Sequence, residues 1–357
     1  MNKSLIIRLM RLGFLAISGV LMVVALSPPM QRWLDERGFI ANQYSYGDLY
    51  NMSNLPGFKE NDIATNGDLT DADKPATHYP DVDLYTLGDS FTNIDTSFYA
   101  GNRNFHIWVG DKTPQYVTLD TTRKNILVVQ IIERVLQERM YSPDYEAIFI
   151  NGGFVPKSVA EFAEKPVEAS NNLETSTSWL LTRFGEQINQ RIEFLLFNSP
   201  LFVRFKEIKA QLLLSLFGRT AGTALSTDGK HLFYQVEVDS TTSYSSFHAI
   251  SDQRLDTAVT NLNSLRRHYL KIGFDEVYIC LVPNKATILD PSHGNYNHQI
   301  ERFEANPRLE APVISTIDTL RQHPNWYHLG DGHWNKKGKE FWLRRVNEVA
   351  ASWSLKR

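Results

Sequence analysis

Short apolar runs that alternate with helical segments constrain the fold of this chain more than any other feature. Leu255–Tyr269 carries apolar residues at helical spacing and stops before Gly273. Ile131–Met140 and Lys337–Trp353 also have helix-forming composition. Four runs have the length and composition of buried strands: Leu84–Leu87, Ile126–Gln130, Ala147–Ile150 and Glu276–Val282. The alternation predicts an α/β fold with a mainly parallel sheet, in which the loops after the strands meet at one edge.

The N-terminus of the chain, residues 1–30, has the pattern of a membrane anchor. Lys3, Arg8 and Arg11 precede or flank an uncharged stretch, Leu12–Leu26. A spanning helix needs about 20 residues. Leu5–Met10 extends the stretch to this length if the side chains of Arg8 and Arg11 reach towards the membrane–water interface. A cleaved signal peptide fits almost as well, but no clear A-x-A cleavage site follows. We expect a single-pass anchor in the cell (inner) membrane, with a cytoplasmic N-terminus and a periplasmic or extracytoplasmic domain.

The rest of the chain divides by composition into a connector and a domain. Residues 31–82 are polar and rich in turn formers, whereas the strand-and-helix pattern occupies 83–357. Within that domain, a segment at about 171–218 has no strand-like alternation and predicts an inserted helical hairpin. Its first arm includes Ile188 and Leu196, and Leu201–Leu216 carries apolar residues on one face of the second. This hairpin either packs as extra core or lies on the membrane or on an integral membrane partner.

Charge and cysteine content exclude several classes of protein. The 357 residues carry a formal charge of −3, and no run of lysine or arginine stands out, so a nucleic-acid partner is not expected. Cys280 is the single cysteine, which excludes an intramolecular disulfide and a multi-cysteine metal site.

Two motifs far apart in the chain have the residue types of a catalytic triad. Gly88-Asp89-Ser90 follows the first apolar run, which places the Ser90 hydroxyl at the open edge of the sheet. Asp331-Gly332-His333-Trp334 precedes the last helix. A serine needs a base, and His333 supplies one that Asp331 can orient. The alternatives are plain turn chemistry for Ser90 and a metal site or a solvated turn for the second motif. No further ligand lies at helical spacing, so no metal is expected.

The pairing of these two motifs resembles the SGNH (GDS-type) hydrolase superfamily, over about Leu84 to Ala351. The form of the second motif is similar to that of the alginate and cell-surface polysaccharide O-acetyltransferases, although in the alginate proteins the Asp-His pair precedes the serine. The resemblance implies a three-layer α/β fold and catalysis by Ser90, His333 and Asp331.

Four further residues are candidates for oxyanion or substrate binding: Asp89, Arg134, Asn151 and Trp334. Arg134 is either an oxyanion donor or the partner of a salt bridge at a helix start. Asn151 is either the nearest substitute for the usual oxyanion asparagine of the superfamily or part of a common Gly-Gly turn. Trp334 offers a ring for sugar stacking, with core packing as the alternative. Pro283-Asn284-Lys285 resembles a Pro-x-Lys loop that lies near the rim of the active site in that branch, and an ordinary turn after a strand is the alternative.

The triad and the anchor predict a membrane-tethered serine enzyme that works through an acyl-serine without a cofactor, and the resemblance implies an O-acyltransferase that acetylates an exported or cell-surface polysaccharide. The resemblance implies that a multipass membrane acyltransferase supplies the acyl group. A carbohydrate acetyl-esterase would use the same triad, and a non-catalytic glycan-binding scaffold of an export complex is the alternative from another class.

Overall fold

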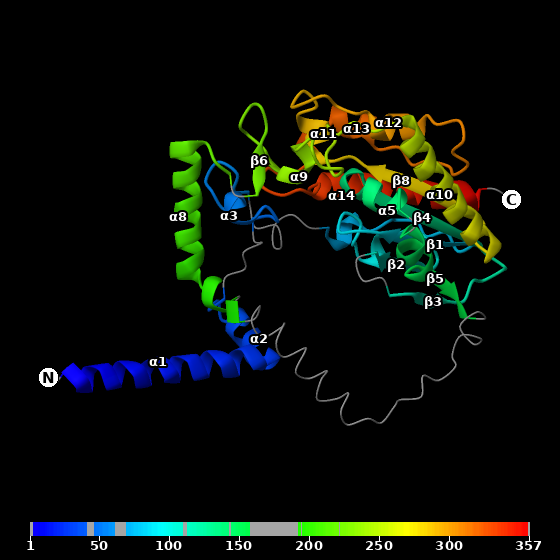
Figure 1. The fold of residues 1–357 in the computed structure, drawn as a ribbon. Helices are drawn as coiled ribbons and strands as arrows, with labels where there is room; N and C mark the ends of the chain where they lie inside the picture. The colour runs from blue at the N-terminus through cyan, green and yellow to red at the C-terminus, as the bar shows by residue number, and fades with distance from the viewer. Residues whose placement is uncertain are drawn as a thin grey trace. The chain divides into compact units, whose positions relative to one another are not determined.

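The computed structural model (Figure 1) describes residues 3–40, 46–60, 69–109, 113–142, 144–157, 192–193, 195–220 and 222–355. The chain forms two compact units. A helical unit comprises Met1–Ser45, Tyr50–Leu55 and Pro166–Ala221, and an α/β unit comprises Tyr46–Leu49, Pro56–Lys165 and Gly222–Arg357.

The centre of the α/β unit is a parallel sheet with the strand order β2-β1-β4-β8. Its strands are β1 (Val82–Gly88), β2 (Asn104–Trp108), β4 (Lys124–Ile132) and β8 (Glu276–Val282). The predictions of strands at Leu84–Leu87, Ile126–Gln130 and Glu276–Val282 are therefore confirmed. All seven residues of β1 are buried, including the polar Asp83 and Thr86, which requires cover on both faces of the sheet.

Three long helices cover the sheet (Figure 1): α5 (Glu133–Met140), α10 (Asp252–Lys271) and α14 (Lys336–Ser354). α10 contacts β8 and α5, and α14 contacts β1 and β4. The Ser251 side chain caps α10 by accepting a hydrogen bond from the Arg254 amide. The Asn335 side chain caps α14 by accepting one from the Lys337 amide. The caps fix where both helices begin, and the start of α14 sets the position of the Asp331–Trp334 motif just before it.

Ala147–Ile150 is not the strand that its composition predicted. It lies in a π-helical segment, η3 (Glu146–Asn151), in which Ile148 and Phe149 are buried. An apolar run of four residues fits a buried strand and a buried helical turn equally well, and tertiary packing decides between them.

The remaining elements of the α/β unit are short. β3 (Gln115–Val117) pairs with β5 (Phe154–Pro156) in parallel, and β6 (Thr223–Leu225) pairs with β7 (Leu232–Tyr234) in antiparallel orientation. The short helices are α9 (Gln235–Val238), α11 (Lys285–Leu289), α12 (Gln299–Glu304), α13 (Ile317–Gln322), η1 (Asp71–Asp73), η2 (Thr96–Phe98) and η4 (Pro324–Trp326).

The helical unit contains α1 (Lys3–Leu26), α2 (Pro28–Glu36), α3 (Tyr50–Ser53) and α8 (Pro200–Phe217). Within α1, Ser4–Leu26 is long and apolar enough to cross a membrane. α8 confirms the predicted second helix of the hairpin and ends at Gly218, whose φ of 61° suits glycine. Most of the predicted first arm, including Ile188, lies outside the described residues.

Candidate active site

Ser90 stands in a tight turn at the carboxyl end of β1. The Asp89 side chain accepts a hydrogen bond from the Phe91 amide at 3.1 Å, and the Asp89 carbonyl accepts one from the Thr92 amide at 3.1 Å. Gln130 near the end of β4 accepts from the Asp89 amide at 2.9 Å and so ties the turn to the sheet. Ser90 is exposed, and within the described part of the chain its backbone amide has no hydrogen-bond partner. This N–H is available to an oxyanion.

The Asp331–His333 loop brings the other two members of the predicted triad to Ser90. Ser90 Oγ lies 2.7 Å from His333 Nε2, and His333 Nδ1 lies 2.7 Å from Asp331 Oδ1. The His333 amide also donates to Asp331 Oδ1 at 2.7 Å, which holds the carboxylate and the ring in one short turn. The three side chains form a continuous hydrogen-bonded chain from hydroxyl to carboxylate, the arrangement of a serine nucleophile with its base and orienting acid.

A second carboxylate, Asp48, joins this chain and was not expected from the sequence. Its Oδ2 lies 3.2 Å from His333 Nδ1, and its Oδ1 accepts from the Gly332 amide at 2.9 Å. The Asp48 amide donates to Asp331 Oδ2 at 2.7 Å, and the Tyr234 hydroxyl donates to the Asp48 carboxylate. Asp48 therefore contacts both the acid and the base. It belongs to the segment that was predicted as a polar connector, and no local motif marks it.

Close backbone approach explains two glycines around Asp48. Gly47 has a φ of 131°, and a Cβ there would lie 2.5 Å from the Gly330 carbonyl oxygen. A Cβ on Gly332 would lie 2.4 Å from the Tyr234 ring. The absence of a Cβ at Gly47 lets the Asp48 segment approach the backbone of the His333 loop, and the absence of a Cβ at Gly332 lets the Tyr234 ring of β7 pack against that loop.

The two carboxylates control the protonation of His333. Burial disfavours the imidazolium, but hydrogen bonds and charge from Asp331 and Asp48 outweigh burial and raise the pKa of His333 to about 10. Burial likewise opposes ionisation of Asp331, yet its hydrogen bonds with His333 and the Asp48 amide lower the pKa of this carboxyl. The site thus strongly stabilises the imidazolium that forms when His333 accepts a proton.

The same three residues have the donor types of a metal site. Ligand atoms of Asp48, Asp331 and His333 lie within 4.8 Å of one another. Each is already engaged, since His333 Nδ1 binds Asp331 Oδ1 and the Asp48 carboxylate accepts from Gly332 and Tyr234. A metal would have to displace these bonds, so the geometry favours a hydrogen-bonded triad.

No family model, no curated protein and no solved structure matches this chain. The chemistry of the site therefore follows from its own geometry.

Lys285 does not lie at the rim, the position that the resemblance implied for its loop, but is fully buried beneath the His333 loop. Its ammonium donates to the carbonyls of Leu232, Leu329 and Asp331 at 2.8, 2.7 and 3.1 Å. Burial lowers the pKa of Lys285 to about 8, although the negative charges of Asp331 and Glu237 act in the opposite direction and raise it. Lys285 thus holds the loop from inside the protein.

We expect Lys285→Met to lower the free energy of unfolding by about 1–3 kcal/mol, because it leaves buried carbonyls without a donor. Urea denaturation of the two proteins measures the difference. Lys337→Met, at an exposed position of α14, is the control and is expected to change the stability by about 0.5 kcal/mol or less. Equal stability of Lys285→Met and the parent protein would contradict this role.

Trp334 corrects a second prediction, because its ring is not available to stack on a sugar. Its side chain is 1% exposed, and its Nε1 donates to the Phe91 carbonyl at 3.0 Å. The ring packs edge-on against Phe91, with ring centroids 5.1 Å apart. Trp334 points into the core while its neighbour His333 points to Ser90, and it ties the Ser90 turn to the His333 loop.

The other three candidates are not members of the hydrogen-bonded triad. Asp89 is buried in its turn, with Oδ2 3.8 Å from Arg139 Nη1. Arg134 forms a salt bridge at the start of α5, with Nη1 2.8 Å from Glu237 Oε1, and its guanidinium lies 4.8 Å from the centroid of the Tyr234 ring. Asn151 is exposed at the end of η3. Among the described residues, the hydrogen bonds that connect Ser90, His333 and Asp331 include none of the three.

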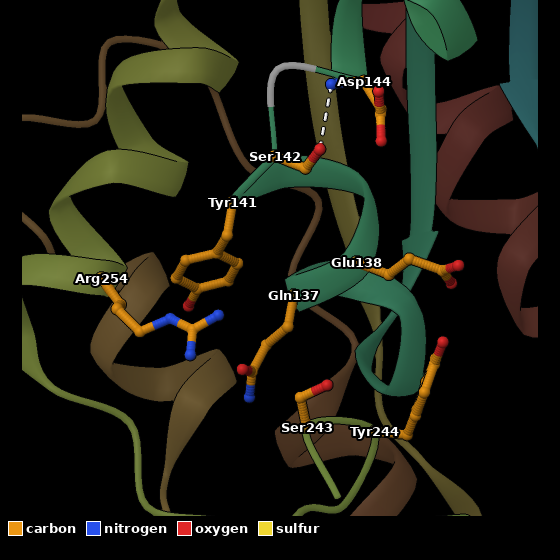
Figure 2. A pocket seen from close by; sticks show the side chains of 8 residues that line it. All are labelled: Gln137, Glu138, Tyr141, Ser142, Asp144, Ser243, Tyr244 and Arg254. Atoms are coloured by element: carbon orange, nitrogen blue, oxygen red, sulfur yellow. Dashed lines mark hydrogen bonds between the residues drawn. The ribbon is translucent and has the colours of Figure 1, made fainter.

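A polar pocket of about 310 Å³ lies at the carboxyl-terminal end of α5 (Figure 2). Gln137 lines it and is 3% exposed, yet within the described part of the chain both its amide nitrogen and its amide oxygen lack a hydrogen-bond partner. The Tyr141 hydroxyl is buried and unpaired in the same way, with the Arg254 guanidinium 5.3 Å from the ring centroid. Buried polar groups are normally satisfied, so this pocket is suited to a ligand that both donates and accepts hydrogen bonds.

Proposed function

We propose that this chain is a membrane-tethered serine O-acyltransferase of the SGNH type, which acetylates an exported or cell-surface polysaccharide. The observation that carries the proposal is the hydrogen-bonded chain Ser90–His333–Asp331, with Ser90 exposed at the carboxyl end of a parallel strand. Active sites of open α/β sheets lie at this edge.

The geometry supports a two-step acyl transfer. His333 Nε2 takes the Ser90 hydroxyl proton while Oγ attacks the carbonyl carbon of an acyl ester, and the Ser90 amide donates to the resulting oxyanion. The imidazolium then returns the proton to the leaving alcohol, which leaves an acyl-serine. A sugar hydroxyl then gives its proton to His333 and attacks the carbonyl carbon of the acyl-serine. The bond from this carbon to Ser90 Oγ breaks, and the imidazolium returns the proton to Oγ, which leaves the new sugar ester and restores Ser90 and neutral His333.

The membrane location is supported by α1. Its apolar length suits a bilayer, and Lys3, Arg8 and Arg11 favour a cytoplasmic N-terminus and an extracytoplasmic α/β unit. A multipass membrane acyltransferase is the proposed acyl donor on that side.

A carbohydrate acceptor is supported by the pocket at α5. Sugar hydroxyls both donate and accept hydrogen bonds, and therefore match the unpaired amide of Gln137 and the Tyr141 hydroxyl. Glu138, Asp144 and Arg254 also line the pocket, and these polar groups can hydrogen-bond to the hydroxyls of a sugar unit (Figure 2).

If the pocket holds the acceptor, Gln137→Leu is expected to reduce the ratio of sugar acetylation to hydrolysis about ten-fold, the loss of about one hydrogen bond. Chromatography of acetylated oligosaccharide and free acetate gives the ratio. Stability is not expected to fall, because leucine removes an unpaired amide. Gln322→Leu, at an exposed position of α13, is the matched control. An unchanged ratio in Gln137→Leu would remove the pocket from the proposal.

The activity itself is tested with the full chain in detergent, an activated acetyl ester and an added oligosaccharide. Mass spectrometry is expected to find an acetyl adduct on Ser90, and the acetyl group is expected on the oligosaccharide. An adduct followed by release of acetate alone would identify an esterase. Folded protein without any adduct would favour the non-catalytic scaffold.

A further inference from the structure

The face of α8 that the sequence predicted to be apolar is open to solvent in the helical unit. Leu201, Phe205, Ile208, Leu212 and Leu216 recur at helical spacing and are each between 50% and 68% exposed. Phe217 at the end of the helix is 65% exposed. Soluble proteins rarely expose a contiguous apolar stripe of this length, so an occupant of this face is expected.

The opposite face of α8 attaches the helix to its own unit. Val203 and Ala210 are buried, and Glu207 accepts a hydrogen bond from Asn54 Nδ2, close to α3, at 2.9 Å. At 100° per residue, this packed stripe lies on the side of α8 away from Phe205 and Ile208. The exposed stripe is therefore not the face that packs α8 as extra core.

Basic residues border the exposed stripe. Arg204 and Lys209 lie on its two sides, and Lys206 lies further around the helix. The acidic residue of α8, Glu207, belongs to the packed face. An apolar stripe with cationic borders fits the boundary between acyl chains and anionic headgroups, where the long basic side chains reach the headgroups.

Two other elements of the same unit have membrane character. α1 has the apolar length of a spanning helix, and α2 begins two residues after it. Trp33 on α2 is 49% exposed, and tryptophan is enriched at membrane–water interfaces.

We propose that α8 lies in the interface of the bilayer that α1 spans, with Leu201, Phe205, Ile208, Leu212 and Leu216 among the acyl chains. This inference rests on the proposed anchoring by α1 and is independent of the triad. A second copy of the chain and the segment at 158–191 are the other occupants that the test distinguishes.

The test uses the full chain reconstituted in vesicles of phosphatidylcholine and phosphatidylglycerol. Single cysteines at Ile208→Cys or Leu212→Cys carry a polarity-sensitive fluorophore, and Gln253→Cys, exposed on α10 of the α/β unit, is the solvent reference. Cys280 is buried, so the parent protein reports the labelling background.

Lipids with nitroxides in the upper acyl chain are expected to quench both α8 labels at least about two-fold more than the Gln253→Cys label. Blue-shifted emission without lipid quenching would show a protein occupant and overturn the proposal. Emission like that of Gln253→Cys would show a solvated helix and also overturn it. Vesicle binding and Ser90 acetylation are measured in the same samples. Absence of vesicle binding would contradict the proposed anchoring by α1, and absence of Ser90 acetylation would contradict the proposed enzymatic activity.

Discussion

Ser90→Ala is expected to lower ester hydrolysis and acetyl transfer by about 10³-fold or more, because no other group takes over as the nucleophile. Thermal stability is expected to stay unchanged, since Ser90 is exposed and its hydroxyl contacts His333 alone among its described hydrogen bonds. Initial rates with an activated acetyl ester and a melting curve measure both effects.

Ser97→Ala is the matched control for Ser90. Ser97 is also exposed, lies in η2 of the same unit and is expected to be dispensable for activity. If Ser90→Ala retained a rate within about ten-fold of the parent protein, Ser90 would not be the nucleophile and the triad would need another explanation.

Asp48→Asn is expected to move the pH dependence of the reaction. Only neutral His333 can accept the serine proton, so kcat/KM should rise with pH towards the pKa of His333, about 10. Removing the Asp48 charge leaves the imidazolium less stabilised, lowers this pKa and should move the acidic limb to lower pH by about one unit. Profiles of kcat/KM between about pH 5 and about pH 10.5 measure the shift.

Two variants give this experiment its controls. Asp331→Asn is expected to lower kcat by about 10²–10⁴-fold, because the ring loses its orienting acid while Asp48 remains nearby. Glu60→Gln removes a different carboxylate, which lies 2.8 Å from His328 Nδ1, and should leave the pH profile in place. An identical acidic limb in Asp48→Asn and the parent protein would show that Asp48 has a structural role only.

Local patterns in the sequence predicted β1, β4 and β8, the helices between them and the position of Ser90 at a strand end. They succeeded because burial on both faces of a parallel strand favours a run of apolar residues, as in the buried residues Ile279–Val282 of β8. The two catalytic motifs were also visible, since their chemistry resides in a few adjacent residues. Their convergence is a property of the tertiary structure.

The structure alone decided which side chains complete the site and which belong to the core. Asp48 reaches His333 across 285 positions of sequence, a distance that no periodicity or motif encodes. For Trp334, sugar stacking and core packing were both open, and for Lys285 the resemblance implied the rim of the site. Packing holds Trp334 inside, and buried carbonyl groups hold Lys285 inside. Strands and helices follow from local composition because their hydrogen bonds are local or repeat regularly. The pairing of Asp48 with His333, in contrast, depends on how distant loops fit together once the core has packed.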